Sequence, residues 1–417
     1  MERNLRGTPP FDDVEAFFRS VLEPGFGSAK PAGDPVPSPD GRWLAFRGER
    51  LDRLEGHALG RICLAGTDGS GLRQVTDGPN DDAEPRWSPD GTRLSFRSDR
   101  ETKGRHQVYL LDTSLPAEAQ KLTSLPGVVE WHQWSSDGSR MLVGLAGTSA
   151  EQADALGSGT LGGEQDLAAW VPQIESSDDA EGERRSLWLV QAGTGEARRI
   201  SPDDRNVWEA DWCGEGHAVA ITSDGAGEDA WYDAGVGLFD LETGAERPLA
   251  ASEVQLGWVA GSPAGDRVAV IEAVCSDRVV VCGDLRVIDV ASGWMTPVEL
   301  GDVDASRASW GDDDRLVVFG RRGLLSLALE VSLRDGVVRE LWSTGGSVGE
   351  LYHPSGAAFG GGVAVVTSSH ARPPSIVVVT GDGEEREVAA PRHPGLDVVL
   401  GAIGRCEPLR WISTDGL

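Results

Sequence analysis

The chain has 417 residues, with 67 acidic and 38 basic side chains and a formal net charge of −29 at pH 7. A protein this acidic repels nucleic acid and anionic membranes, so we expect neither as a partner. No stretch approaches the roughly 18 apolar residues that cross a bilayer. The first twenty residues also carry charges where a secretory signal needs an apolar core. We therefore expect a folded, cytoplasmic protein.

Cysteines and histidines show no metal-site spacing. The seven histidines form no HExxH pair or close ligand pair, and we expect neither a metal nor another cofactor. The five cysteines are scattered without a CxxC pair, which predicts reduced thiols. Cys275 and Cys282 are close enough in sequence to meet across a hairpin, but alternation on buried strands explains them equally well.

Residues 1–30 form an arm in which apolar side chains recur at helical spacing, and this predicts a short amphipathic helix over residues 11–22. Asp12 and Glu15 have the spacing of a capping box. The apolar face must cover a surface, either on the rest of the chain or on a partner. The candidate contacts are Phe11, Phe17 and Phe18.

Residues 31–390 contain seven copies of one pattern, a polar turn followed by an apolar strand. The copies are DGRWLAF, DGTRLSF, DGSRMLV, EGHAVAI, AGDRVAV, DDDRLVV and GGGVAVV, beginning at residues 40, 90, 137, 215, 264, 312 and 360. Five of the six intervals are 47 to 50 residues, and each unit divides into four short strands. A period of about 40 to 50 residues with several strands is typical of a propeller blade. The sequence predicts an all-β, seven-bladed β-propeller of four-stranded antiparallel blades.

The Ser-Pro-Asp-Gly corner has a structural explanation. Proline presets the backbone angle, aspartate bonds N–H groups two residues on, and glycine accepts a positive φ. Tryptophans recur just before the corner, where a wide ring fills the wedge between neighbouring sheets. We interpret five of them as packing groups, namely Trp87, Trp134, Trp212, Trp258 and Trp310.

The ring closure and one insertion are also predicted. The first and last units each supply four strands of their own, so blades 1 and 7 should meet at a noncovalent seam that could open. The one long interval, 78 residues, indicates an insertion at about 145–185, between the second and third strands of blade 3. That insertion is either a mobile, acidic loop or a lid carrying Trp170 and Pro172.

Residues 391–417 are expected to lead out of the propeller and to begin a new strand and turn. The phrase EPLRWISTDGL, together with the repeats WSPDG…SFRSDR and the strand pairs SLWLVQAGTGEARRIS and QVYLLDTSLPAEAQKLTS, resembles the propeller domain of prolyl-oligopeptidase-type serine peptidases, nearest the acylaminoacyl-peptidase branch. The resemblance implies that residues 391–417 are an exit linker toward an α/β-hydrolase domain. Trp411 and Asp415 are then candidate contacts with that domain.

The catalytic parts of that family are missing from these 417 residues. The one match to Gly-x-Ser-x-Gly is GGSVG at residues 345–349, in a link between expected strands. A nucleophile elbow needs a strand before the serine and a helix after it. Ser347 is therefore not expected to be catalytic, and neither His353 nor His370 can be assigned as its base. Whether the protein belongs to an enzyme stays open.

Two functions remain. The resemblance implies the noncatalytic half of a serine peptidase, which admits short peptides or acylated amino acids to a hydrolase domain or separate catalytic chain. The alternative is a freestanding, TolB-like propeller that binds proteins or peptides, since such propellers share the Ser-Pro-Asp-Gly units. A propeller lyase would need polar groups converging on the axis, where His132 is the one candidate. The sequence leaves homo-oligomerisation open.

Overall fold

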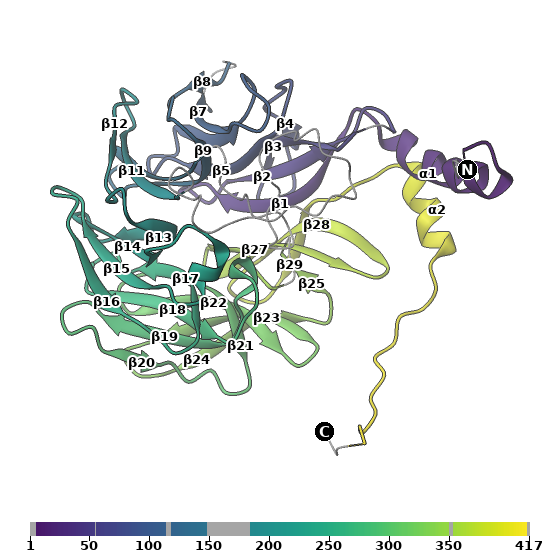
Figure 1. The fold of residues 1–417 in the computed structure, drawn as a ribbon. Helices are drawn as coiled ribbons and strands as arrows, with labels where there is room; N and C mark the ends of the chain where they lie inside the picture. The colour runs from purple at the N-terminus through teal and green to yellow at the C-terminus, as the bar shows by residue number, and fades with distance from the viewer. Residues whose placement is uncertain (1–5, 55, 114–117, 148–183, 350–352, 415–417) are drawn as a thin grey trace, which may run out of the picture.

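In the computed structural model the described residues are 6–54, 56–113, 118–147, 184–349 and 353–414. They form seven antiparallel sheets in a ring, with a helical arm outside it (Figure 1). The predicted seven-bladed propeller is confirmed. No helix in the described part of the chain is long and apolar enough to span a membrane.

The first four blades each use four consecutive strands. Blade 1 has β1 (Ala29–Pro37), β2 (Trp43–Arg50), β3 (Leu59–Gly66) and β4 (Arg73–Gln74). Blade 2 has β5 (Asp82–Trp87), β6 (Arg93–Ser98), β7 (Gln107–Asp112) and β8 (Gln120–Lys121). Blade 3 has β9 (Val128–Trp134), β10 (Arg140–Ala146), β11 (Ser186–Gln191) and β12 (Ala197–Arg199). Blade 4 has β13 (Asn206–Cys213), β14 (His217–Ser223), β15 (Gly235–Asp240) and β16 (Glu246–Ala250).

The last three blades follow the same order, except that the first strand of blade 7 is split in two. Blade 5 has β17 (Gln255–Gly261), β18 (Arg267–Ala273), β19 (Asp284–Asp289) and β20 (Met295–Pro297). Blade 6 has β21 (Asp304–Trp310), β22 (Arg315–Arg322), β23 (Leu325–Ser332) and β24 (Val338–Thr344). Blade 7 has β25 (Ser347–Val348), β26 (Ala357–Phe359), β27 (Gly362–Ser369), β28 (Arg372–Val379) and β29 (Glu385–Ala389).

Strand direction gives the ring two different faces. Successive strands in a blade are antiparallel, so the turns after first and third strands lie on one side, which we call the corner face. The links between second and third strands lie on the other side. The chain enters blade 1 and leaves blade 7 on that second side, which we call the exit face.

The repeated corner is held by its own side chains. In blade 1 the Ser38 hydroxyl donates to Asp40 Oδ1 at 2.6 Å and accepts the N–H of Trp43 at 3.0 Å. Asp40 Oδ1 also accepts the N–H of Arg42 at 3.1 Å, and Gly41 has a φ of 70°. Blades 2 and 3 repeat this bonding. The corner is therefore a structural element of the ring.

Four of the five tryptophans join neighbouring blades. The indole N–H groups of Trp87, Trp134, Trp212 and Trp310 each donate to the preceding blade, at Val36 O, Ser95 Oγ, Gln133 O and Ala260 O. The prediction that Trp258 occupies the same position is wrong. Trp258 lies four residues before its corner, has a φ of 59° and donates to Val281 O within its own blade.

A glycine replaces the tryptophan in blade 5 because the space is filled by backbone. A Cβ atom on Gly261 would stand 2.1 Å from the carbonyl oxygen of Trp212 in blade 4. No side chain fits between the two backbones. This close approach explains why the repeat is broken there.

The predicted seam between blades 1 and 7 is confirmed, since each blade is built from its own stretch of chain. One apolar cluster spans it, and its members include Leu44, Phe46, Val366 and Ile376. The insertion of blade 3 also falls where expected, between β10 and β11. Trp170 and Pro172 lie outside the described residues.

The arm contains the predicted helix, α1 (Pro9–Leu22), which is followed by the 3₁₀ turn η1 (Glu23–Gly25). The capping box is wrong: the N-cap is Thr8 without a side-chain cap, and Glu15 instead pairs with Arg19 at 2.7 Å. Prolines at the start of α1 lack the N–H groups that a cap would bind. Two more 3₁₀ turns, η3 (Glu228–Trp231) and η4 (Arg278–Val280), lie in links on the exit face.

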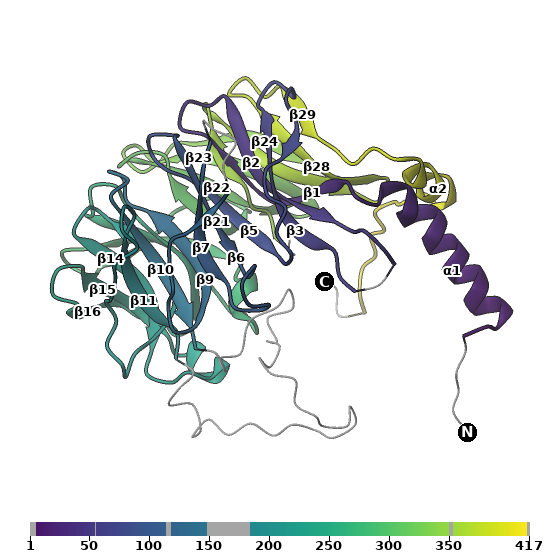
Figure 2. The same ribbon diagram turned by 90° about the horizontal axis from the view of Figure 1, so that it is seen from above.

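The stretch after blade 7 contains a second helix, α2 (Pro394–Ala402), which the sequence did not predict. It packs against α1 beside blades 1 and 7 (Figure 2). The approach is close, because a Cβ atom on Gly395 would stand 1.9 Å from the carbonyl oxygen of Val21. The strand expected after it is not found: residues 403–414 contain no helix or strand, and Asp415 lies outside the described residues.

Candidate functional site along the propeller axis

The first strands of the blades line the axis and carry charged residues where their pairing is interrupted. In β5 the register shifts between Ala83 and Arg86, which leaves Glu84 at a bulge with a φ of 50°. Asp34 in β1 occupies the same place, with a φ of 49°. A bulge turns one extra side chain away from the ladder. The bulge that β1 and β5 share thus brings the carboxyl groups of Asp34 and Glu84 toward the axis.

Toward the exit face, Glu130 is held by two arginines from different blades. Arg185, at the start of blade 3's third strand, donates from Nε at 2.8 Å, and Arg278 of blade 5 lies 3.9 Å away. Both guanidinium groups lie over the ring of Trp208, at 5.2 and 5.6 Å from its centroid. Burial raises the pKa of Glu130, but the two arginines outweigh it, so the net shift is downward. Glu130 is therefore ionised at neutral pH.

Two other axial glutamates are poorly compensated. Glu84 lies 3.2 Å from Arg97, yet burial outweighs the attraction of that arginine and raises the pKa of Glu84. Burial likewise raises the pKa of Glu209 to about 7, against the opposing attraction of Arg307. Glu209 Oε1 accepts the backbone N–H of Trp258 at 2.6 Å. Glu209 therefore titrates near neutral pH.

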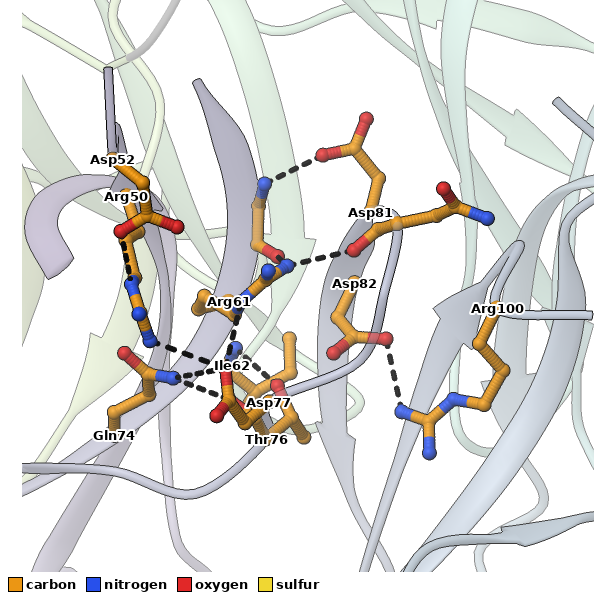
Figure 3. A network of polar contacts seen from close by, with 12 residues as sticks. Arg50, Asp52, Arg61, Ile62, Gln74, Thr76, Asp77, Asp81, Asp82 and Arg100 are labelled. Atoms are coloured by element: carbon orange, nitrogen blue, oxygen red, sulfur yellow. Dashed lines mark hydrogen bonds and ion pairs between the residues drawn. The ribbon is translucent and has the colours of Figure 1, made fainter. Parts of the chain in front are cut away.

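A polar network joins blades 1 and 2 at the rim of the exit face (Figure 3). The buried Arg61 donates from Nη1 to the carbonyl oxygens of Gly60 and Asn80, at 2.7 and 2.6 Å. Asp82 is fully buried and accepts from Arg100 at 3.0 Å. The Arg61–Asn80 bond fixes blade 1 against the segment that enters blade 2, and the Asp82–Arg100 pair braces blade 2 internally, so both roles are structural.

At the corner-face end of the axis lies a cavity of about 450 Å³ between blades 1 and 4. Arg86, Gln133 and Asp211 line it from equivalent places, each two residues before the corner. Burial raises the pKa of Asp211 to about 7, because its only compensation comes from two backbone N–H groups. The repeat spacing could have located these residues, had positions been counted back from each corner.

Three of the five predicted contact residues are exposed, namely Phe17, Phe18 and Trp411. Phe17 and Phe18 have exposed fractions of 43% and 51%, and Phe11 is half-buried. Trp411 has an exposed fraction of 74% in the linker. The structure therefore leaves apolar surface on the exit side of the molecule, available to a partner.

Ser347 lies on a strand and not at an elbow. It belongs to β25, where it is exposed and pairs with Ser368 of β27. Among the described residues that follow, no helix occurs before α2. His370 contacts the carbonyl oxygen of Gly404 at 2.9 Å, and burial lowers the pKa of His353. This arrangement gives Ser347 no helix N-terminus to activate it.

His132 is a buried bridge between blades. Its Nε2 lies 2.8 Å from the Ser95 hydroxyl oxygen, which also accepts the indole N–H of Trp134. Burial lowers the pKa of His132 well below its ordinary value, so the ring is neutral. Within the described ranges, no three histidine, cysteine or acidic side chains are placed to hold a metal ion.

The thiols of the two buried cysteines are protonated. Burial raises the pKa values of Cys63 and Cys213 to about 12. A thiol with so high a pKa is neither a nucleophile nor a ready metal ligand at neutral pH.

These features define a β-propeller with an open apolar exit side. No family model matches the chain. Over 121 residues, or 29% of the chain, it is 35% identical to the uncharacterized peptidase YuxL of Bacillus subtilis, and that stretch is 18% of the relative. The acylaminoacyl peptidase of Pyrococcus horikoshii superposes with a TM-score of 0.61 and 16% identity, over 94% of this chain and 56% of that one.

A second solved structure is a propeller alone. The β-propeller domain of the Trilobed protease from Pyrococcus furiosus, which has an open velcro topology, gives a TM-score of 0.56 and 14% identity, over 87% of this chain and 98% of that one. The resemblance to the propeller domain of prolyl-oligopeptidase-type peptidases is thus confirmed in its fold. The chain spans little more than half the length of the acylaminoacyl peptidase.

Proposed function

We propose that this protein is the noncatalytic propeller of a cytoplasmic peptidase of the prolyl-oligopeptidase type, which limits the access of substrates to an α/β-hydrolase domain. The observation that carries the proposal is that both chain ends leave on one face, beside exposed apolar side chains of the arm and linker. Exposed apolar surface of this kind is typical of an interface. The fold shared with the acylaminoacyl peptidase supports the same assignment.

The hydrolase partner would supply all of the covalent chemistry. Its serine would form the acyl intermediate, while the propeller would exclude folded proteins and admit short peptides or acylated amino acids. Exclusion needs a narrow path, and the cluster of Glu130, Arg185 and Arg278 beside the axis supports the assignment of that path to the propeller. The propeller's part is therefore selection by size and charge.

The first test separates the propeller from the chemistry. The purified chain and its Ser347→Ala variant should both fail to hydrolyse an acyl-phenylalanine nitroanilide and to react with a fluorophosphonate probe. Labelling that the Ser347→Ala change abolishes would contradict the proposal, because it would make Ser347 the nucleophile.

The second test concerns the partner. An α/β-hydrolase encoded downstream in the same frame or in a neighbouring gene should co-elute with the propeller in gel filtration. A Phe17→Ser/Phe18→Ser double variant should weaken that association, whereas Trp294→Ser should not, because Trp294 is 77% exposed on the other face. With the propeller bound, hydrolysis of short acyl-peptides should continue and cleavage of unfolded casein should fall.

The alternative, a freestanding scaffold propeller, predicts different results. No α/β-hydrolase would be encoded nearby, and loss of the aromatic residues of α1 would change no hydrolase activity. The Trilobed protease domain shows that a propeller of this fold has been solved as a separate domain. The co-elution experiment therefore distinguishes the two functions.

A further inference from the structure

We propose that the cavity at the corner face binds a short zwitterionic peptide, with its carboxylate on Arg86 and its ammonium group on Asp211. This site lies on the face opposite the chain ends, so it goes beyond the proposed hydrolase interface and does not depend on it. Blades 1 to 4 line this cavity, which is open to solvent and has a volume of about 450 Å³. Ligand cavities of about 300–1,000 Å³ are usual for small molecules.

The cavity contains one basic and one acidic side chain, Arg86 and Asp211, and neither forms an ion pair with a described residue. The Arg86 guanidinium donates from Nη1 to the carbonyl oxygen of Pro85 at 2.8 Å, and it forms no ion pair with any described residue. The nearby Glu84 is already paired with Arg97 at 3.2 Å. Arg86 therefore has donors available for an anion.

Asp211 is the complementary group. Its two oxygens accept the backbone N–H groups of Trp212 at 2.8 Å and Gly261 at 3.2 Å, and it has no ion pair within the described ranges. A half-buried carboxylate without a cation is costly, and a ligand cation would lower that cost. Arg86 and Asp211 occupy the same repeat position in blades 2 and 4, with Gln133 of blade 3 between them.

The remaining lining is mostly aromatic and apolar, with Ser135 and Ser136 as its polar members. Trp87, Trp134 and Trp212 edge the cavity, and their indole N–H groups are already bonded to the neighbouring blades. Only ring carbons are then left to contact a ligand. The apolar part of the lining also includes Val36, Pro37, Pro39 and Pro89. Such surfaces suit apolar or proline side chains, so a peptide fits better than a polar amino acid alone.

The arrangement of charges selects against ligands with one charge. A peptide with a blocked amino end would leave Asp211 unpaired, and one with a blocked carboxyl end would leave Arg86 unpaired. A charge-assisted hydrogen bond lost in this way changes affinity by about tenfold or more. The site should therefore prefer peptides with two free ends.

The test uses the full chain and the dipeptide prolyl-phenylalanine in three forms: free, N-acetylated and C-terminally amidated. Binding is measured by calorimetry and by tryptophan fluorescence. We expect the free dipeptide to bind at least about tenfold more tightly than either blocked form. Equal binding of all three forms, or no heat and no fluorescence change up to millimolar concentration, would overturn the proposal.

The variants assign each end of the ligand. Arg86→Gln should remove the preference for a free carboxylate and keep the preference for a free amino group, and Asp211→Asn should do the reverse. Arg42→Gln is the matched control, since Arg42 lies on the same face outside the cavity. Circular dichroism checks that each variant is folded. The preference that each variant keeps, for a free amino group or for a free carboxylate, is a second check. If Arg86→Gln kept the carboxylate preference, the assigned orientation would be wrong.

Discussion

Asp211 should make the stability of the ring depend on pH. Its carboxyl accepts the N–H of Gly261 in the next blade, and burial raises its pKa from 3.8 to about 7. The folded protein thus keeps a proton that the unfolded chain releases at pH values above about 4. Between pH 4 and 7 the unfolded state binds fewer protons, so stability falls as the pH rises.

The size of this effect follows from the shift. Three pKa units correspond to about 4 kcal/mol at 1.36 kcal/mol each, and about 2–3 kcal/mol of that is lost between pH 5 and pH 8. This is an upper limit, because Asp211 is half-buried and water screens it. Asp211→Asn cannot titrate, and its loss of one acceptor costs about 1 kcal/mol at every pH.

The assay is urea unfolding followed by tryptophan fluorescence at pH 5, 6.5 and 8 with fixed ionic strength. Relative to the parent, the unfolding free energy of Asp211→Asn should increase by about 2 kcal/mol between pH 5 and pH 8. The pKa of Glu209 is also raised to about 7, but Glu209 titrates in both proteins, so its contribution cancels in the difference between them. The control is Asp203→Asn, because the Asp203 side chain is 94% exposed. Its unfolding free energy should vary with pH in the same way as that of the parent. Parallel curves for Asp211→Asn would refute the assigned burial.

Two further substitutions test the contacts between blades. Gly261→Ala should destabilise the protein by about 3 kcal/mol in urea unfolding, because its Cβ would stand 2.1 Å from Trp212 O, whereas Gly216→Ala has open space and should change little. Trp310→Phe should cost about 1–2 kcal/mol by the same assay, since it leaves a carbonyl oxygen of blade 5 unbonded, while the exposed Trp294→Phe should be nearly neutral. Equal losses within either pair would contradict the corresponding contact.

The repeat pattern was sufficient to predict the ring. Each corner depends on residues adjacent in sequence, such as Ser88, Asp90 and Arg93, so its geometry is local. The seven copies then specify the number of blades, and the positions of the ends specify the seam. Helix α2 was missed because the close contact of Gly395 with Val21 joins positions 374 residues apart, which no local pattern records.

The axial charges could be predicted only in part. Glu84 and Glu130 are visible in the sequence, but which arginines reach them depends on register shifts and on links from distant blades. Arg278 contacts Glu130 of blade 3 from a link of blade 5. The misassignment of Trp258 was avoidable, because the sequence itself places Gly261, and not Trp258, directly before the corner at Ser262.

A substrate could enter through the seam between blades 1 and 7 or along the axis, and the two routes differ in energetic cost. Opening the seam between blades 1 and 7 would expose buried side chains such as Phe46, Leu44, Val366 and Ile376. At about 2 kcal/mol for each large apolar side chain, the cost approaches 10 kcal/mol. The axis instead carries the ion pairs of Glu130 with Arg185 and Arg278, whose side chains are at most 18% exposed, and breaking a buried pair of this kind costs about 3–5 kcal/mol. For this propeller we therefore favour entry along the axis, or by movement against a partner domain, over opening of the seam.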